Sequence, residues 1–269
     1  MPTVSTPNAD LHCERSGSGE PLLLIQGMSG THVSWGEPFL AELRESFEVV
    51  AFDNRGIGLS APIDGPFTIA EMAEDTAALM QVLGIENAHV AGISMGGMIA
   101  QELALAHPER LRSLTLGCTY CGGPGSRLMP EENARKLMEG MASGDREKAI
   151  RASYEVNLSP AFRADESHWA AFHEMATAVP AAKQTIELQA QAIFGHDTSG
   201  RLGEISTPTL IVHGTEDGVL PFPNGELIAS LIPSARFETL AGVGHMFWWE
   251  QPGASAGLIR EHALATARS

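Results

Sequence analysis

Cysteine and basic residues are scarce in this 269-residue chain, and long apolar runs are missing. Its 17 Lys and Arg stand against 33 Asp and Glu, and the formal net charge of −16 argues against binding nucleic acid or an anionic membrane. No apolar stretch approaches the length of a membrane span, and the first residues lack the basic segment and apolar stretch of a secretory signal. We therefore expect a cytoplasmic protein without nucleic-acid or membrane partners.

The three cysteines cannot all pair with one another. Cys118 and Cys121 form a C-x-x-C motif at the end of a predicted strand, but the chain has no second ligand pair for zinc and no thioredoxin-like context. We interpret these residues as structural thiols, and we expect neither a metal nor a cofactor.

Apolar runs alternate with helical patterns along the chain, and no internal repeat or low-complexity tract interrupts them. The predicted strands cover residues 22–26, 47–52, 88–93, 111–116, 209–212 and 236–240. The clearest helix, 69–83, is opened by a capping box of Thr68 and Glu71. Strands joined by crossover helices predict an α/β protein with a mostly parallel sheet flanked by helices.

Ser94 lies in the pentapeptide Gly-Ile-Ser-Met-Gly, between the predicted strand 88–93 and a helical pattern over 95–106. A sharp turn must join these two elements, and the flanking glycines allow the backbone to fold tightly there. This is the nucleophile-elbow pattern, in which the serine hydroxyl is exposed at the end of the sheet. Because G-x-S-x-G also arises by chance, the assignment of Ser94 as a nucleophile depends on its partners.

A serine nucleophile needs a base and an acid that orients the base, and here both follow in the order Ser, Asp, His. Asp217 comes after the strand 209–212, and His245 comes after the strand 236–240 and a glycine-rich turn. Glu216 is the alternative acid. The acid could instead follow the preceding predicted strand, 111–116. That position is excluded because residues 111–130 contain no Asp or Glu. We predict the catalytic residues Ser94, Asp217 and His245.

The transition state of acyl transfer also needs donors for an oxyanion. One donor is expected to be the amide of Met95, the residue after the nucleophile, and the other the amide of Met28 in the glycine-flanked loop 26–30. Gly27, in the same loop, is a candidate for substrate contact.

Four segments resemble the α/β-hydrolase superfamily over nearly the whole chain: QGMSG at 26–30, FDNRGIGLS at 52–60, GISMGG at 92–97, and the pair HGTEDGVLP at 213–221 and GVGHMFWWEQP at 242–252. The resemblance implies an α/β-hydrolase fold with a mostly parallel eight-stranded sheet and a helical cap inserted after strand 6. Asp53 to Ser60 resemble the D-x-R-G-x-G-x-S turn of the family, which borders the site. One departure is Gln26, where many relatives have His.

The segment 122–200 carries helical patterns alone, at 130–141, 145–156, 165–176 and 181–194. We predict a cap over 122–200 and a core domain formed by 1–121 and 201–269. By analogy with the superfamily, the cap shapes the substrate pocket. Large apolar residues of the cap and of the segment after His245 contact either the substrate or the protein core; these are Met138, Trp169, Phe172, Met175, Phe247 and Trp248.

The sequence most resembles small cap-bearing serine carboxylesterases, enol-lactonases of the 3-oxoadipate type and cofactor-free haloperoxidases. It predicts a serine hydrolase that cleaves an ester or lactone of a small, moderately apolar substrate through an acyl-enzyme. A serine rather than an aspartate at the elbow argues against the dehalogenase and epoxide-hydrolase branches. A carbon–carbon bond hydrolase acting on a ring-cleavage diketone, a perhydrolase side activity and a non-catalytic ligand-binding protein remain alternatives. The oligomeric state, including a homo-oligomer, stays open.

Overall fold

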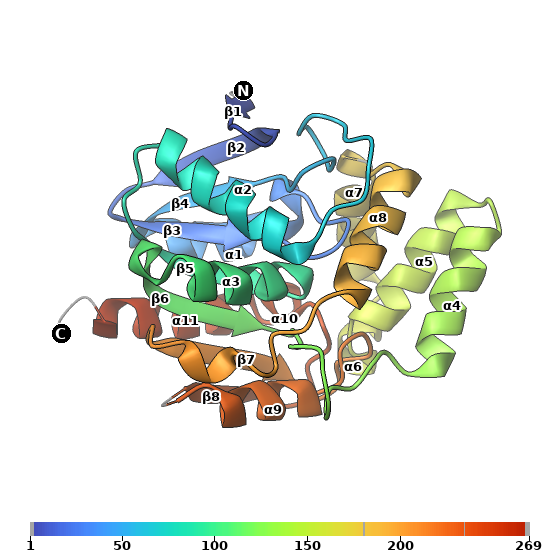
Figure 1. The fold of residues 1–269 in the computed structure, drawn as a ribbon. Coiled ribbons are helices and arrows are strands. Elements are labelled where there is room, and N and C mark those ends of the chain that lie inside the picture. Colours follow the sequence, from blue (N-terminus) through green and yellow to red (C-terminus); the bar gives the residue numbers. More distant parts are fainter. Residues whose placement is uncertain (1–2, 180, 234, 267–269) are drawn as a thin grey trace.

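A computed structural model describes residues 3–179, 181–233 and 235–266. Its centre is an eight-stranded sheet in the order β1-β2-β4-β3-β5-β6-β7-β8 (Figure 1). The strands are β1 (Thr3–Ser5), β2 (Asp10–Gly17), β3 (Glu20–Ile25), β4 (Phe47–Phe52), β5 (Ala88–Ile93), β6 (Leu111–Gly117), β7 (Thr209–Gly214) and β8 (Arg236–Leu240). Strand β2 runs antiparallel to β1 and β4, and the remaining neighbours are parallel. The predicted α/β architecture, a mostly parallel eight-stranded sheet flanked by helices, is confirmed.

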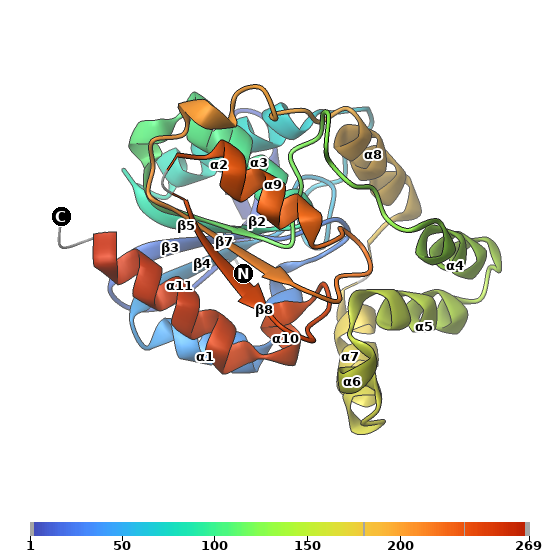
Figure 2. The same ribbon diagram turned by 90° about the horizontal axis from the view of Figure 1, so that it is seen from below.

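Helices cover both faces of the sheet, as Figure 2 shows in the view from below. One face carries α1 (Glu37–Arg44) and α11 (Pro252–Thr266), and the other carries α2 (Ile69–Val82), α3 (Met95–Ala106) and α9 (Pro223–Leu231). The shorter elements of the core are α10 (Phe247–Glu250) and the 3₁₀ helices η1 (His32–Trp35), η2 (Pro108–Arg110) and η3 (Leu202–Glu204).

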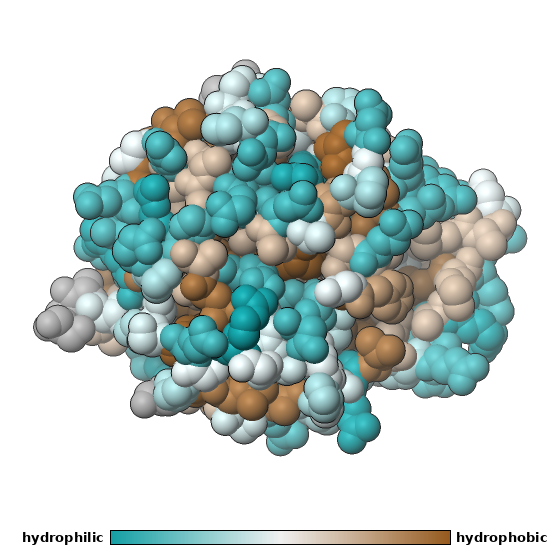
Figure 3. Space-filling model, viewed as in Figure 1, coloured by the Kyte–Doolittle hydropathy of each residue, from teal (hydrophilic) through white to brown (hydrophobic). Residues whose placement is uncertain are grey.

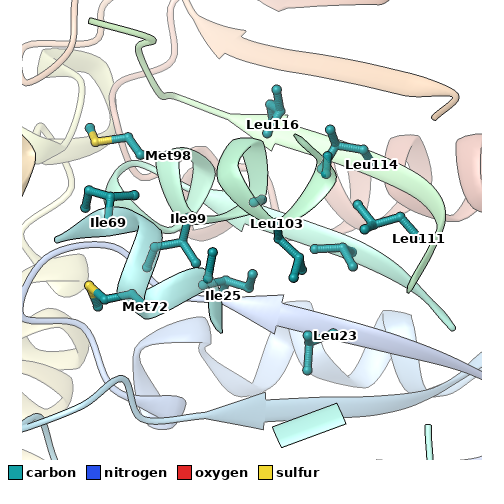
Figure 4. Close-up of a cluster of buried hydrophobic side chains, with 14 of the residues drawn as sticks. Leu23, Ile25, Ile69, Met72, Met98, Ile99, Leu103, Leu111, Leu114 and Leu116 are labelled. Carbon is teal, nitrogen blue, oxygen red and sulfur yellow. The ribbon is translucent and has the colours of Figure 1, made fainter. Parts of the chain in front are cut away.

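Apolar side chains fill the space between the sheet and α2 and α3. Figure 4 shows Leu23 and Ile25 of β3 together with Met98, Ile99 and Leu103 of α3, all of them buried. Burial on both faces explains why the central strands are apolar runs without alternation. At about 25 cal/mol for each Å² removed from water, such burial is the main force that holds the layers together.

The capping box predicted at the start of α2 is present. The Glu71 carboxylate accepts from the Thr68 backbone N–H at 2.7 Å, and the Glu71 N–H donates to Thr68 Oγ1 at 3.1 Å. The box satisfies backbone donors that the first turn of a helix leaves without partners. Local chemistry therefore sets where α2 begins.

Among the described residues between β6 and β7, five α-helices project beyond the carboxyl ends of the parallel strands (Figures 1 and 2). They are α4 (Glu131–Ala142), α5 (Arg146–Asn157), α6 (Pro160–Arg163), α7 (Ser167–Ala178) and α8 (Lys183–Phe194). The four longer helices agree with the four helical patterns of the sequence to within two residues at either end. Helix α6 is a single turn opened by Ser159, whose Oγ accepts from the Phe162 N–H at 3.2 Å.

Glu250 connects this helical insertion to the core. Its carboxylate accepts hydrogen bonds from the Ser159 N–H at 2.7 Å, from Ser159 Oγ at 2.6 Å and from the Gly244 N–H at 3.0 Å. Gly244 immediately precedes His245. The start of α6 and the loop that carries His245 therefore share one carboxylate.

No helix among the described residues is long and apolar enough to cross a membrane.

The buried side chain of His196, just after α8, should make the free energy of unfolding depend on pH. Burial lowers the pKa of His196 to about 4 from an ordinary value of 6.5, and its side chain is 1% exposed. Between pH 6.5 and pH 4 the unfolded chain binds a proton that the folded protein does not, so stability increases with pH across this window. His196 contributes up to about 3 kcal/mol to this loss on acidification.

The measurement is the free energy of unfolding at several pH values for the wild type and for His196→Gln. We expect the wild-type curve to be steeper by about 1.4 kcal/mol per pH unit between pH 4 and 6.5, which corresponds to one proton. Equal slopes for the two proteins would contradict the assignment.

Candidate active site

Ser94 forms the turn between β5 and α3, with φ of 53° and ψ of −123°. Such a conformation is rare for a residue with a side chain and costs of order 1–3 kcal/mol. Two hydrogen bonds hold the turn: the Ser94 N–H donates to the Gly117 carbonyl at 2.9 Å, and Thr119 Oγ1 donates to the Ser94 carbonyl at 2.7 Å. The sharp strand–turn–helix expected of a nucleophile elbow is present.

Two glycines permit close contacts around this turn. A Cβ on Gly96 would overlap the Ile25 carbonyl, so only glycine lets α3 lie this close to the end of β3. A Cβ on Gly27 would lie 2.9 Å from Ser94 Cβ. The loop after β3 therefore passes directly beside the serine, where Gly27 was predicted to border the substrate.

His245 and Asp217 are hydrogen-bonded across two loops. His245 Nδ1 lies 2.7 Å from Asp217 Oδ2, and the Asp217 side chain is fully buried. The other oxygen, Asp217 Oδ1, accepts from the backbone N–H groups of Val219 at 2.8 Å and Leu220 at 2.9 Å. Because both carboxylate oxygens are used, the geometry fixes the orientation of the His245 ring.

Burial opposes ionisation of Asp217, but the charge of His245 and hydrogen bonds from His213 and His245 outweigh it. The pKa of Asp217 lies well below its ordinary value. His213 Nε2 is 3.1 Å from Asp217 Oδ2 and 2.8 Å from the Leu220 carbonyl. A carboxylate that stays ionised next to an imidazole stabilises the imidazolium that forms when the ring accepts a proton.

Backbone contacts explain why Asp217, and not its neighbour Glu216, meets His245. The Glu216 N–H donates to the Val243 carbonyl at 2.9 Å, and this bond joins the acid loop to the histidine loop. Glu216 itself is exposed, whereas Asp217 is 7% exposed. The structure brings Asp217 and His245 together and leaves Glu216 at the surface.

Cys118 lies beside this pair, and no functional role was predicted for it. It is the first residue after β6, it has a φ of 39°, and its Sγ lies within 4.8 Å of ligand atoms of Asp217 and His245. Burial and the nearby Asp217 carboxylate raise the pKa of the Cys118 thiol well above its ordinary value, so it is a neutral thiol. Its place directly after β6 is the one sequence signal that could have drawn attention to it, because parallel strands end at the same edge of the sheet.

The two predicted oxyanion donors differ in their surroundings. Met95 is the first residue of α3, so its amide has no acceptor within the helix. Met28 lies in a turn closed by a 3.2 Å bond from the Gly30 N–H to the Gly27 carbonyl, and no hydrogen bond of the described residues uses its amide. Neither amide therefore has a hydrogen-bond acceptor among the described residues.

Gln26 supports the loop that carries Met28. Its Oε1 accepts from the Gly27 N–H at 2.9 Å, and its carbonyl accepts from Asn54 Nδ2 at 3.1 Å. On the cap side, Gln189 Oε1 of α8 accepts from the Ser29 N–H at 2.9 Å. Sequence reasoning missed Gln189, because nothing in its local sequence indicates a contact 160 residues away.

The aromatic residues after His245 pack into the core. Phe247 is 1% and Trp248 is 4% exposed, and the indole N–H groups of Trp248 and Trp249 both donate to the Ser34 carbonyl, at 3.0 and 2.9 Å. These contacts join α10 to η1. Phe247 and Trp248 are therefore buried in contacts within the protein, and their contact with a substrate stays a prediction.

The candidate substrate residues of the cap have different environments. Phe172 is 3% exposed and its ring centroid is 6.3 Å from that of Trp249. The guanidinium carbon of Arg151 lies over the Trp169 ring, 3.7 Å from the centroid of that ring. Met175 is half-buried against the core cluster that contains Phe172, and Met138 is 62% exposed. Phe172 and Met175 are therefore placed at the boundary between cap and core, and Met138 faces solvent.

A groove of about 550 Å³ lies on the cap between α4 and α5. Charged side chains and Trp169 line it, and it contains none of Ser94, Asp217 and His245. Figure 3 shows apolar groups among hydrophilic ones on the side where the cap meets the core. The groove is separate from the candidate active site, which lies at the carboxyl ends of β5 to β8.

Comparison with known proteins gives consistent matches over most of the chain. The family model for the alpha/beta hydrolase fold matches residues 20–252. The protein named putative carbamate hydrolase RutD, from Azorhizobium caulinodans, is 34% identical over 250 residues, or 92% of each chain. A poly(3-hydroxyalkanoate) depolymerase from Ectopseudomonas oleovorans is 30% identical and covers 89% of this chain and 82% of its own. The solved structure of Est816, an N-acyl homoserine lactone degrading enzyme, is 27% identical with a TM-score of 0.81, and covers 97% and 99%.

Proposed function

The chain belongs to the alpha/beta hydrolase fold family, and on this premise we propose that it is a serine hydrolase that cleaves a carboxylic ester or lactone through an acyl-enzyme. The observation that carries the proposal is the buried 2.7 Å contact between His245 Nδ1 and Asp217 Oδ2, at the same end of the sheet as the Ser94 elbow. Acyl transfer through a serine needs a nucleophile, a base and an acid that orients the base.

In the proposed mechanism, His245 removes the proton of Ser94 Oγ as the oxygen attacks the substrate carbonyl. The amides of Met28 and Met95 bind the oxyanion of the tetrahedral intermediate. Collapse of this intermediate expels the alcohol, which takes its proton from His245, and leaves an acyl group on Ser94. Water activated by His245 then hydrolyses the acyl-enzyme and restores the serine.

Relatives support the substrate class. The depolymerase is named for a polyester and Est816 for a lactone, and both compounds present an acyl carbonyl to a nucleophile. The apolar side chains at the boundary between cap and core favour a small, moderately apolar acyl or ring group.

A carbamate is the second candidate, and the 34% identity to RutD favours it. The same mechanism applies, since a carbamate also has a carbonyl with a leaving group. Its nitrogen donates electrons to the carbonyl and makes it less electrophilic. The chemistry at Ser94 is then unchanged, and the two substrate classes differ in rate.

A substrate panel tests the proposal. We expect kcat/KM for short p-nitrophenyl esters or small lactones to exceed that for an aryl carbamate and for a ring-cleavage diketone by at least about tenfold, or 1.4 kcal/mol of transition-state stabilisation. A fluorophosphonate probe should label the protein once, at Ser94. Faster turnover of the carbamate or the diketone would move the activity to that substrate, and absence of labelling would contradict serine chemistry.

A further inference from the structure

A second cluster of polar side chains lies away from the catalytic loops. His12 and Glu14 belong to β2, and His32 begins η1. Glu14 Oε1 is 3.7 Å from the Nε2 atom of each histidine, and the three ligand atoms all lie within 4.8 Å of one another. The rings of His12 and His32 have their centroids 4.6 Å apart. One carboxylate and two imidazoles thus converge on a single point.

One nitrogen of the His12 ring is buried without a hydrogen-bond partner among the described residues. This atom is Nε2, and His12 is 1% exposed. A buried polar atom without a partner costs about 1–3 kcal/mol. Native proteins rarely tolerate this cost without a water, an ion or a function to offset it. The orphaned atom points to a ligand.

The turn after β4 holds the backbone of His12 in place. Ser60 Oγ accepts from the His12 N–H at 2.9 Å and donates to the Asp53 carbonyl at 2.6 Å. The Asp53 N–H in turn donates to the His12 carbonyl at 2.9 Å. The position of His12 is therefore set by long-range hydrogen bonds and does not depend on a bound ion.

The same turn orients His32. Asp53 Oδ1 accepts from the His32 N–H at 2.6 Å and from Nδ1 at 2.9 Å, and Asp53 is fully buried. With its proton on Nδ1, the ring presents the lone pair of Nε2 to Glu14. A carboxylate that orients an imidazole in this way is the usual partner of a metal-binding histidine.

We propose that His12, Glu14 and His32 form a binding site for a zinc-type divalent transition-metal ion. Two atoms bound to zinc at about 2.0–2.1 Å in tetrahedral geometry lie roughly 3.4 Å apart, close to the two 3.7 Å separations here. Imidazole nitrogen and carboxylate oxygen suit Zn²⁺, and the side chain of Glu14, 43% exposed, leaves room for a water as the fourth ligand. This proposal departs from the expectation, drawn from the sequence, that the protein binds no metal. The proposed acyl transfer makes no use of the ion.

The bound ion acts as a clamp between β2 and η1. His32 lies four residues after Met28 and is the first residue of η1, so the ion also restrains the start of η1. Anything that binds only the folded chain stabilises it, so Zn²⁺ should raise the midpoint of thermal unfolding. The prediction rests on the folded structure and not on the proposed hydrolase activity.

The test uses the untagged, chelator-treated full chain and titrates it with ZnCl₂ by calorimetry and by thermal unfolding. We expect one ion per chain at this site, a raised unfolding midpoint, and at least tenfold weaker binding in Glu14→Gln. Glu14 is partly exposed, so this variant should fold. Glu74→Gln is the matched control, because Glu74 is an exposed carboxylate 2.9 Å from His107 outside the cluster, and its binding should equal that of the wild type.

Cys118, Asp217 and His245 are the competing ligands, because their atoms also lie within 4.8 Å of one another. Binding that persists in His245→Ala and weakens in Glu14→Gln supports the proposed site. Binding that is unchanged in Glu14→Gln, or that is lost in His245→Ala alone, overturns it, as does the absence of saturable binding to the wild type. A second variant, His32→Gln, should lose the d–d absorption bands of tetrahedral Co²⁺, and bands that persist would also contradict the site.

Discussion

Ser94→Ala is expected to lower kcat for a p-nitrophenyl ester by about four to six orders of magnitude. The hydroxyl is the only group in the proposed mechanism that forms the acyl bond, so its removal leaves the oxyanion donors and substrate binding alone. The structure favours this role because the elbow holds Ser94 at the carboxyl end of β5, beside the Gly27 backbone. The measurement is the steady-state rate, with mass spectrometry to show that no acyl-enzyme accumulates.

Two control variants separate loss of the nucleophile from loss of the fold. Ser94→Gly also lacks the hydroxyl, but glycine adopts a φ of 53° without strain, so it should be equally inactive and at least as stable as Ser94→Ala. Ser230→Ala, at an exposed position of α9, should keep the wild-type rate. Retention of more than a small fraction of turnover in Ser94→Ala would show that another group is the nucleophile.

Asp217→Asn is expected to lower kcat by about 10⁴-fold, and Glu216→Gln should change it by less than about twofold. An amide in place of the buried carboxylate can donate a hydrogen bond to His245 Nδ1 and so favour the wrong tautomer of the ring. It also removes the negative charge that stabilises the imidazolium. Glu216 is exposed and its backbone, not its side chain, joins the two loops.

The two variants form a matched pair, since each replaces one carboxylate by an amide at adjacent positions. Steady-state kinetics with the same ester, together with thermal unfolding, give both readouts. Comparable losses in the two variants would indicate a structural effect of the loop. A large loss in Glu216→Gln with a small one in Asp217→Asn would assign the acid to Glu216.

Much of the fold followed from local signals. The buried parallel strands were readable because an apolar run without alternation has few other uses, and the start of α2 was readable from Thr68 and Glu71. The insertion appeared as consecutive helical patterns. The prediction of Ser94, Asp217 and His245 used only their order along the chain and the strand that precedes each of them.

The N-terminal strands show where local signals fail. Residues 10–17 mix charged and apolar side chains, and nothing in them indicated a strand; β2 forms because it pairs with β4, for example Cys13 with Phe52. The same pairing buries His12 and brings Glu14 close to His32. The proposed metal site is therefore invisible in the sequence, where its ligands are separated by up to 20 residues.

The sequence by itself predicted the turn at Ser94, the start of α2 and the buried strands. Each of these features depends on neighbours within a few residues. Only the tertiary structure decided the contacts between distant segments. These place Cys118 beside Asp217 and His245, Gln189 on the loop of Met28, and Glu250 between the helical insertion and the His245 loop. The physical reason is that each contact depends on how helices and loops pack across the ends of the sheet. The residues next to a side chain in the sequence do not determine that packing.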